Sequence, residues 1–225
     1  MKPGSTSFRQ GLTLIELLVV IAIIAILAAL ILPAMNGNNT RATGTWCMIN
    51  QKQIALSFMY WQDDIRDVYS WQVSTNNGGT MELIADHQAA SQFQMISNLV
   101  GDPTVFICPT DKTKQAALKN RTLSNSNISY FVNVDAVQTT NGSKLILTGD
   151  RHLSADNKPV QPGLFIFTNG MKLSWTHELH GSIPDLPAGY LSFVDGHAER
   201  IAPRPPFESD VFTRQGLASA RLLVP

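Results

Sequence analysis

The sequence has no excess of charge of either sign, no internal repeat and no low-complexity run. Its 17 basic and 17 acidic residues cancel, and charged residues make up only 15% of the 225 positions. Without a basic stripe, nothing argues for a nucleic-acid partner, and without an acidic tail nothing argues for a partner held by charge. We therefore expect no nucleic acid among the partners of this protein.

Motifs that signal catalysis or a metal are also missing. His177 and His180 have the spacing H-x-x-H, which differs from the H-E-x-x-H of zinc proteases, and no nucleophile elbow marks a serine hydrolase. A His/Asp group that holds a metal is conceivable, and its further members would be His152, His197, Asp150, Asp185 and Asp195. Surface histidines and turn aspartates explain these residues more simply, so we assign no catalytic residue, metal site or cofactor.

One long apolar run stands apart from the rest of the chain, since every residue from Leu17 to Leu32 is apolar. A helix over residues 12–35 would be about 36 Å long, which is enough to cross a hydrocarbon core of roughly 30 Å. Lys2 and Arg9 precede the run without any acid. This flank predicts a single membrane pass with a cytoplasmic N-terminus and a head across the membrane.

Glu16 is the anomaly of this run, because an acid at the edge of a membrane segment costs free energy and usually marks function. It lies four residues after Leu12. A cut after Gly11 would place the new amino group about one helical turn from the carboxylate. The two charges could then pair within one helix or between neighbouring copies. Pro33 predicts a kink late in the helix, because proline removes a backbone hydrogen bond.

The segment Gly11-Leu-Thr-Leu-Ile-Glu16, with the apolar run and Pro33, resembles the processing signal of type IV pilins and type II secretion pseudopilins. The resemblance implies that a prepilin peptidase cuts after Gly11 and methylates the amino group of Leu12, and that Glu16 and Pro33 act in assembly. Leu12 departs mildly from the phenylalanine of most members. A secretory signal peptide or an ordinary signal anchor are alternatives, but neither explains Gly11 and Glu16.

The same resemblance implies a structural subunit of a type IV pilus or type II secretion filament, and not an enzyme. Its partners would be the prepilin peptidase, other pilin or pseudopilin subunits, and the inner-membrane assembly platform. Two other functions stay open. One is a membrane-anchored metal-dependent hydrolase that uses the histidines, and the other is an anchored binding module that never polymerises.

These features divide the chain into a leader of residues 1–11, a membrane and assembly helix of residues 12–35, and a periplasmic or extracellular head of residues 36–225. The expected fold class is α+β and pilin-like, with a long N-terminal hydrophobic helix followed by a globular head with an antiparallel β-sheet. Residues 36–44 are rich in Asn and Gly, which disfavour helix interiors. We expect a loose link between helix and head there.

Two helices are predicted in the first half of the head. From Trp46 onward, residues recur at spacings of three and four in a mainly apolar stripe made of Cys47, Asn50, Ile54, Phe58 and Trp61. A second helix is predicted over residues 81–99, with buried candidates Ile84, His87, Phe93, Ile96 and Leu99. Gly101-Asp-Pro103 ends it, and a short strand is predicted to end at Cys108.

The second half of the head is predicted to form strands over residues 128–134, 144–148, 163–167 and 190–194. Asp195-Gly196 separates the last of these from residues 197–201, and this dipeptide is a strong hairpin signal. The tail from Pro203 has three prolines in four residues and is expected to leave the sheet, and its last residues, 217–224, are expected either to dock or to fray.

Cys47 and Cys108 are the two cysteines of the chain. An even pair in an oxidising compartment predicts a disulfide; the alternative is two buried free thiols.

Short head motifs also resemble a prepilin-type subgroup of planctomycetes, verrucomicrobia and relatives that is named for a C-terminal His-x9-Asp-Gly motif. They are the Cys47–Leu56 pattern, Cys108-Pro-Thr-Asp111, Gly149-Asp-Arg151 and Phe193-Val-Asp-Gly-His197. Here fourteen residues, not nine, separate His180 from Asp195.

Overall fold

The computed structural model divides the chain into two compact units, Met1–Arg41 and Ala42–Pro225. It describes residues 13–36, 38–64, 67–118, 122–138, 142–168, 170–176, 179–180, 188–201 and 219–225, with side chains for all of these except 31–42 and 144. The leader and the predicted cleavage bond between Gly11 and Leu12 therefore lie outside the described residues.

The N-terminal unit contains the helix α1, Leu14–Asn36, which continues through Pro33. This confirms the N-terminal helix. Every described side chain from Thr13 to Leu30 is exposed, although nearly all of them are apolar. Among the residues described with side chains, which in α1 end at Leu30, no helix is long and apolar enough to cross a membrane.

The helix α2, Asn38–Asp64, uses the predicted apolar stripe. Cys47, Ile54 and Phe58 of this stripe have no exposed surface. The expected loose link is wrong for residues 38–44, which are helical. Gly44 has a packing reason to be glycine, because a Cβ there would lie 2.2 Å from the hydroxyl oxygen of Tyr190. Glycine is a poor helix former, but at this position it lets α2 approach Tyr190 closely without breaking the helix.

The predicted second helix is shorter than expected. A 3-10 turn, η3, covers Glu82–Ile84, and the α-helix α3 covers Ala89–Val100. Between them His87 has a left-handed backbone with φ of 55°. The break explains why the burial prediction for His87 is wrong, since His87 is exposed. The prediction for Leu99 is also wrong, because Leu99 in the last turn of α3 is exposed. The other candidates, Ile84, Phe93 and Ile96, are buried.

Short 3-10 helices add further regular structure to the described part of the head. They are η1 Ser70–Gln72, η2 Thr75–Asn77, η4 Pro103–Phe106, η5 Asn125–Asn127 and η6 Gly142–Lys144. The predicted strand before Cys108 is wrong, because Val105 and Phe106 belong to η4 and the next two residues form no strand. The Asp102 side chain accepts a hydrogen bond from the backbone N–H of Thr104 and so starts a capped turn.

Six strands form an antiparallel sheet in the order β5-β9-β1-β2-β7-β8. Their bounds are β1 Tyr130–Asn133, β2 Ile146–Asp150, β5 Gly163–Thr168, β7 Gly189–Phe193, β8 Ala198–Ile201 and β9 Ser219–Val224. With α1, this sheet confirms the α+β pilin-like fold class. The predicted hairpin is also confirmed, since β7 pairs with β8 and Gly196 has φ of 83° at the turn.

The C-terminal strand β9 is the main surprise of the sheet. It lies between β5 and β1 and pairs with β5 along six residues, from Gly163↔Val224 to Thr168↔Ser219. Leu222 and Leu223 have no exposed surface. The expectation that the tail leaves the sheet is therefore wrong for residues 219–224, which dock as an interior strand and do not fray. Residues 202–218, which include the prolines, lie outside the described residues.

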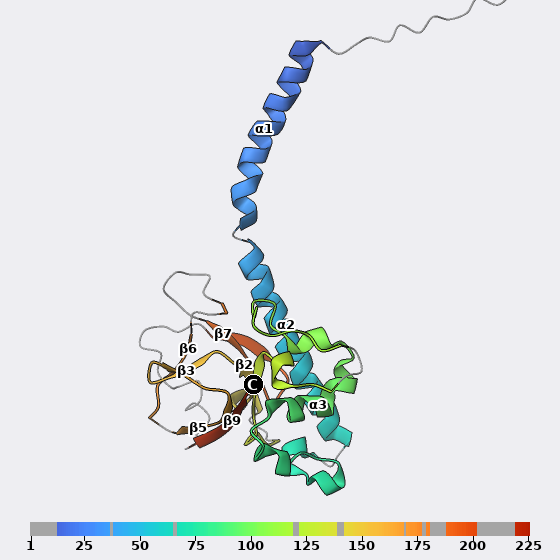
Figure 1. Cartoon of the computed structure of the whole chain (residues 1–225), viewed down its shortest axis with the longest axis vertical. Helices are drawn as coiled ribbons and strands as arrows, with labels where there is room; N and C mark the ends of the chain where they lie inside the picture. Colours follow the sequence, from blue (N-terminus) through green and yellow to red (C-terminus); the bar gives the residue numbers. More distant parts are fainter. Residues whose placement is uncertain are drawn as a thin grey trace, which may run out of the picture. The chain divides into compact units, whose positions relative to one another are not determined.

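A smaller sheet of β3 Leu153–Ala155, β4 Lys158–Pro159 and β6 Leu173–Trp175 has the order β4-β3-β6. Together with the helices, it covers the larger sheet on both faces (Figure 1). One core joins α2 and α3 to Tyr130, Val132, Leu147 and Leu223. The other joins the small sheet to Phe131, Ile146, Leu191 and Leu222. Alternate residues therefore enter different cores, which explains the continuous apolar runs of these strands.

A buried polar chain links α2 to the sheet. The Thr148 hydroxyl of β2 donates to the side-chain oxygen of Gln51, and it lies 2.6 Å from the hydroxyl of Ser192 on β7. All three residues are fully buried. Because buried polar groups are costly unless they are hydrogen-bonded, these contacts favour one seating of α2 on the sheet.

Candidate functional site

A capping box begins α1 at the predicted assembly residue. The backbone N–H and the hydroxyl of Thr13 both donate to Glu16 Oε2, at 2.8 Å each. The backbone N–H of Glu16 donates to Thr13 Oγ1 at 3.3 Å. The reciprocal pattern satisfies N–H groups that have no partner within the helix. The spacing T-x-x-E before an apolar run signals this cap, although we did not predict it from the sequence.

The other predicted N-terminal site residues are not all described. Gly11 and Leu12 lie outside the described residues, and Pro33 lies within α1 but without a described side chain. Glu16 is exposed, as are the apolar side chains that follow it up to Leu30. This part of α1 therefore presents an uncovered apolar surface with one carboxylate near its N-terminus.

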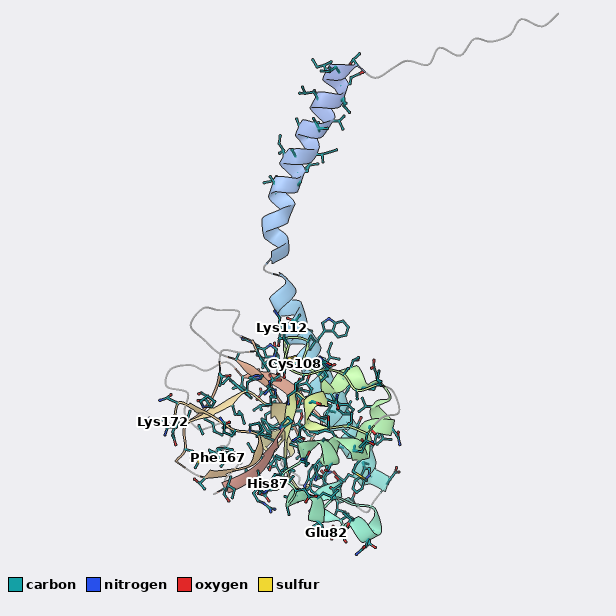
Figure 2. All side chains as sticks on the ribbon, in the orientation of Figure 1. Glu82, His87, Cys108, Lys112, Phe167 and Lys172 are labelled. Carbon is teal, nitrogen blue, oxygen red and sulfur yellow. A yellow bond between two sulfur atoms is a disulfide. The ribbon has the colours of Figure 1, made fainter. Side chains whose placement is uncertain are left out.

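In the head, Cys47 and Cys108 form a disulfide across 61 positions of sequence, with their Cα atoms 5.3 Å apart. Cys47 comes from α2, and Cys108 follows η4; Figure 2 labels Cys108. Both residues have no exposed surface. The crosslink therefore ties the first head helix to the segment that enters the Pro109 turn.

His180 and Asp150 lie against this disulfide. His180 Nε2 is 3.3 Å from Cys108 Sγ and 3.3 Å from Asp150 Oδ2. The backbone N–H of Tyr190 donates to the same Oδ2 at 2.8 Å, and the rings of His180 and Tyr190 meet edge to face. Burial, followed by the charge of Asp150, raises the pKa of Tyr130 well above its ordinary value of 10.0.

A second buried carboxylate follows the disulfide. Asp111 accepts hydrogen bonds from Arg151 Nε at 2.7 Å and from Arg151 Nη2 at 3.2 Å, and a third from the hydroxyl of Thr113 at 2.7 Å. Burial alone would raise the pKa of Asp111, but the bonds from Arg151 and Thr113 outweigh it and hold the pKa at about 2. The pair thus joins two of the short head motifs, Cys108–Asp111 and Gly149–Arg151.

The structure brings together only part of the histidine group considered in the sequence analysis. His180 and Asp150 meet, whereas His197 pairs with Asp195 in a largely exposed contact of 2.5 Å. His152 is buried, and His177 and Asp185 lie outside the described residues. Among the described residues, a group with metal-ligand chemistry forms from Cys47, Cys108, Asp150 and His180. We did not predict this group from the sequence, because its members come from four segments that lie far apart in the chain.

Residues 7–32 match the family model described as the prokaryotic N-terminal methylation motif. No curated protein and no solved structure matches the chain.

The match covers Gly11, Leu12, Thr13 and Glu16 and shows that the chain carries a prepilin-type signal. Such a signal supports a subunit of the type IV pilin or pseudopilin class, and a structural rather than an enzymatic role. It also implies processing by a prepilin peptidase, polymerisation with pilin subunits and membrane anchoring.

Proposed function

We propose that this protein is a structural subunit of a type IV pilus or a type II secretion filament. The observation that carries the proposal is the methylation motif over residues 7–32, which holds Gly11 and Glu16 in the register of a prepilin signal. A prepilin peptidase cuts the bond between Gly11 and Leu12 and methylates the new amino group. Residues 12–35 then hold the subunit in the inner membrane, with the head in the periplasm.

Assembly replaces lipid around the helix with other copies of the same helix. The exposed apolar side chains of α1 from Leu14 to Leu30 supply a surface on which neighbouring helices pack through van der Waals contacts. Glu16 accepts the charged amino group of Leu12 from a neighbour, because a charge left alone in an apolar bundle is costly. One ion pair per subunit can therefore fix the stagger of the helices, and the head faces outward.

The direct test is mass spectrometry of the N-terminus of the mature protein, taken from the membrane of its host. The expected peptide begins at a singly methylated Leu12. Replacing Gly11 with leucine blocks the cut and leaves precursor in the membrane, whereas the matched leader variant Gly4→Leu is processed. An intact Met1, or a cut beyond Pro33, rules the proposal out.

A second measurement separates the filament subunit from an anchored module that never polymerises. Mature protein released by shearing sediments as filament if it assembles, and it remains in the membrane if it does not. The expected result is that the subunit appears in the sheared fraction, alone or with other subunits of the same class. Processed protein found in the membrane alone favours the anchored module.

A further inference from the structure

Four side chains with metal-ligand chemistry meet inside the head. Cys47 comes from α2, Cys108 follows η4, Asp150 ends β2 and His180 follows β6. One ligand atom from each lies within 4.8 Å of all the others, and all four residues are buried. Packed elements therefore hold the four groups in place, as a preformed binding site requires.

One carboxylate oxygen of Asp150 lacks a hydrogen-bond partner within the described part of the chain. Its Oδ2 accepts the backbone N–H of Tyr190 and lies near His180 Nε2, whereas its Oδ1 has no hydrogen-bond partner among the described residues. The residue is only 1% exposed. Buried carboxylate oxygens are normally paired or bound to a metal, so an oxygen without a partner on a member of this group points to a ligand.

The distances suit a small tetrahedral ion. In a zinc site, bond lengths of about 2.0–2.3 Å place neighbouring ligand atoms roughly 3.3–3.8 Å apart. His180 Nε2 already lies 3.3 Å from both Cys108 Sγ and Asp150 Oδ2. The two sulfur atoms, which are bonded in this structure, would have to separate.

We propose that, when Cys47 and Cys108 are reduced, these two cysteines with Asp150 and His180 bind one Zn²⁺, and that the disulfide is the oxidised, metal-free state of the same site. Two thiolates, a neutral imidazole and a carboxylate complete four-coordination, which is typical of a structural rather than a catalytic zinc centre. The inference concerns the head alone and holds whether or not the protein forms filaments.

The two states interconvert by balanced thiol chemistry. The newly made chain carries both cysteines as thiols, and binding of Zn²⁺ displaces their two protons. Oxidation requires a disulfide of an oxidoreductase as the electron acceptor. The electrons of the two thiolates pass to that disulfide, its sulfur atoms take up two protons, the Cys47–Cys108 bond forms and Zn²⁺ leaves.

The test uses the full chain in detergent micelles, in an oxidised and a reduced form. Each form is freed of metal and titrated with Zn²⁺ and, as a spectroscopic probe, with Co²⁺. The reduced chain is expected to bind one equivalent and to show the thiolate charge-transfer and tetrahedral absorption bands of Co²⁺. The oxidised chain is expected to bind no metal at this site. Equal uptake by the two forms overturns the proposal.

Ligand variants show whether the site is built or whether two thiols simply chelate the metal. His180→Ala and Asp150→Asn are each expected to weaken binding by the reduced chain at least tenfold, since even partners outside the ligand set are worth about 10–100-fold. The matched control is His197→Ala, which removes a partly exposed histidine outside the group. Undiminished binding in both ligand variants, or an equal loss in the control, overturns the site.

Two further measurements test the proposal even if the reduced chain does not fold without metal. Zn²⁺ should raise the unfolding temperature of the reduced wild-type chain in a concentration-dependent way, and should leave the oxidised chain unchanged. Oxidation of the zinc-loaded chain should release one Zn²⁺ for each disulfide formed. A reduced chain that stays unfolded in excess Zn²⁺, or one that keeps its metal after oxidation, contradicts the proposal.

Discussion

Glu16 accepts two hydrogen bonds of 2.8 Å from Thr13, one from the backbone N–H and one from the hydroxyl. The same carboxylate is the proposed partner of a neighbouring amino group in the filament. Glu16 therefore has a local role as the cap of α1 and a proposed role in assembly. Suitable substitutions can separate the two, because a cap needs an acceptor and an ion pair needs a charge.

The first prediction is that Glu16→Gln is processed by the peptidase but fails to enter filaments. Glutamine keeps the oxygen that a capping box uses, and it removes the charge that the neighbouring amine needs. Glu16→Leu should fail in the same way. The control Thr13→Ala loses the cap, which costs about 1 kcal/mol, and should still assemble. Sedimentation of sheared filament measures the outcome, and normal assembly of the Glu16→Gln chain refutes the charge-pairing role.

The second prediction concerns acid stability and the Asp111–Arg151 pair. The pKa of Asp111 is about 2, below its ordinary value of 3.8. The lowered pKa stabilises the fold fully above pH 3.8, and this contribution is lost as pH falls from 3.8 toward 2. Its size is about 2 kcal/mol at neutral pH. Urea unfolding of the wild type across this range should show the loss.

Variants of the pair provide the control. Arg151→Met leaves a buried carboxylate without its cation and should cost about 3 kcal/mol at neutral pH. The double variant Asp111→Asn with Arg151→Met should recover part of this loss. Arg221, whose pair with Asp135 is more exposed, offers the comparison, and Arg221→Met should cost less than about 1 kcal/mol. If Arg151→Met and Arg221→Met lower the free energy of unfolding equally, burial does not make the Asp111–Arg151 pair the stronger one.

The third prediction is that replacing Cys47 and Cys108 with alanine lowers the free energy of unfolding by about 4 kcal/mol, within a usual range of about 2–5 kcal/mol. The cause is the freedom that the unfolded chain regains when a crosslink across 61 positions is lost. Urea unfolding in the presence of a chelator, so that no metal contributes, measures the change. A loss below about 1 kcal/mol contradicts a stabilising crosslink.

The fourth prediction concerns the contact of Gly44 with Tyr190. Glycine to alanine inside a helix normally stabilises by about 1 kcal/mol. At Gly44 the new Cβ would meet the Tyr190 hydroxyl oxygen at 2.2 Å. Gly44→Ala should therefore destabilise the head by about 1–3 kcal/mol. In a Tyr190→Phe background Gly44→Ala should cost less stability, because the clashing oxygen is gone. If the cost is unchanged, the contact with the Tyr190 hydroxyl is not its cause.

Several parts of this protein can be predicted from short stretches of its sequence. The prepilin signal and α1 follow from residues that are neighbours along the chain, as does the stripe of Cys47, Ile54 and Phe58 on α2. The β7–β8 hairpin follows from Asp195-Gly196 for the same reason. Helical periodicity, turn chemistry and a processing motif each act over a few residues, so a short window contains the whole signal.

Other features depend on residues that are far apart in the chain, and only the tertiary structure decided them. Residues 219–224 were expected only to dock or to fray, yet they form an interior strand between β5 and β1, where Leu222 and Leu223 are buried. Arg151 finds Asp111 across 40 positions, and Asp150 and His180 reach the cysteines from separate elements. The sequence by itself determined the N-terminal signal and the elements built on local pattern. The pairing of strands and the buried polar group were decided by packing, because contacts between distant segments form only when the chain has closed around a common core.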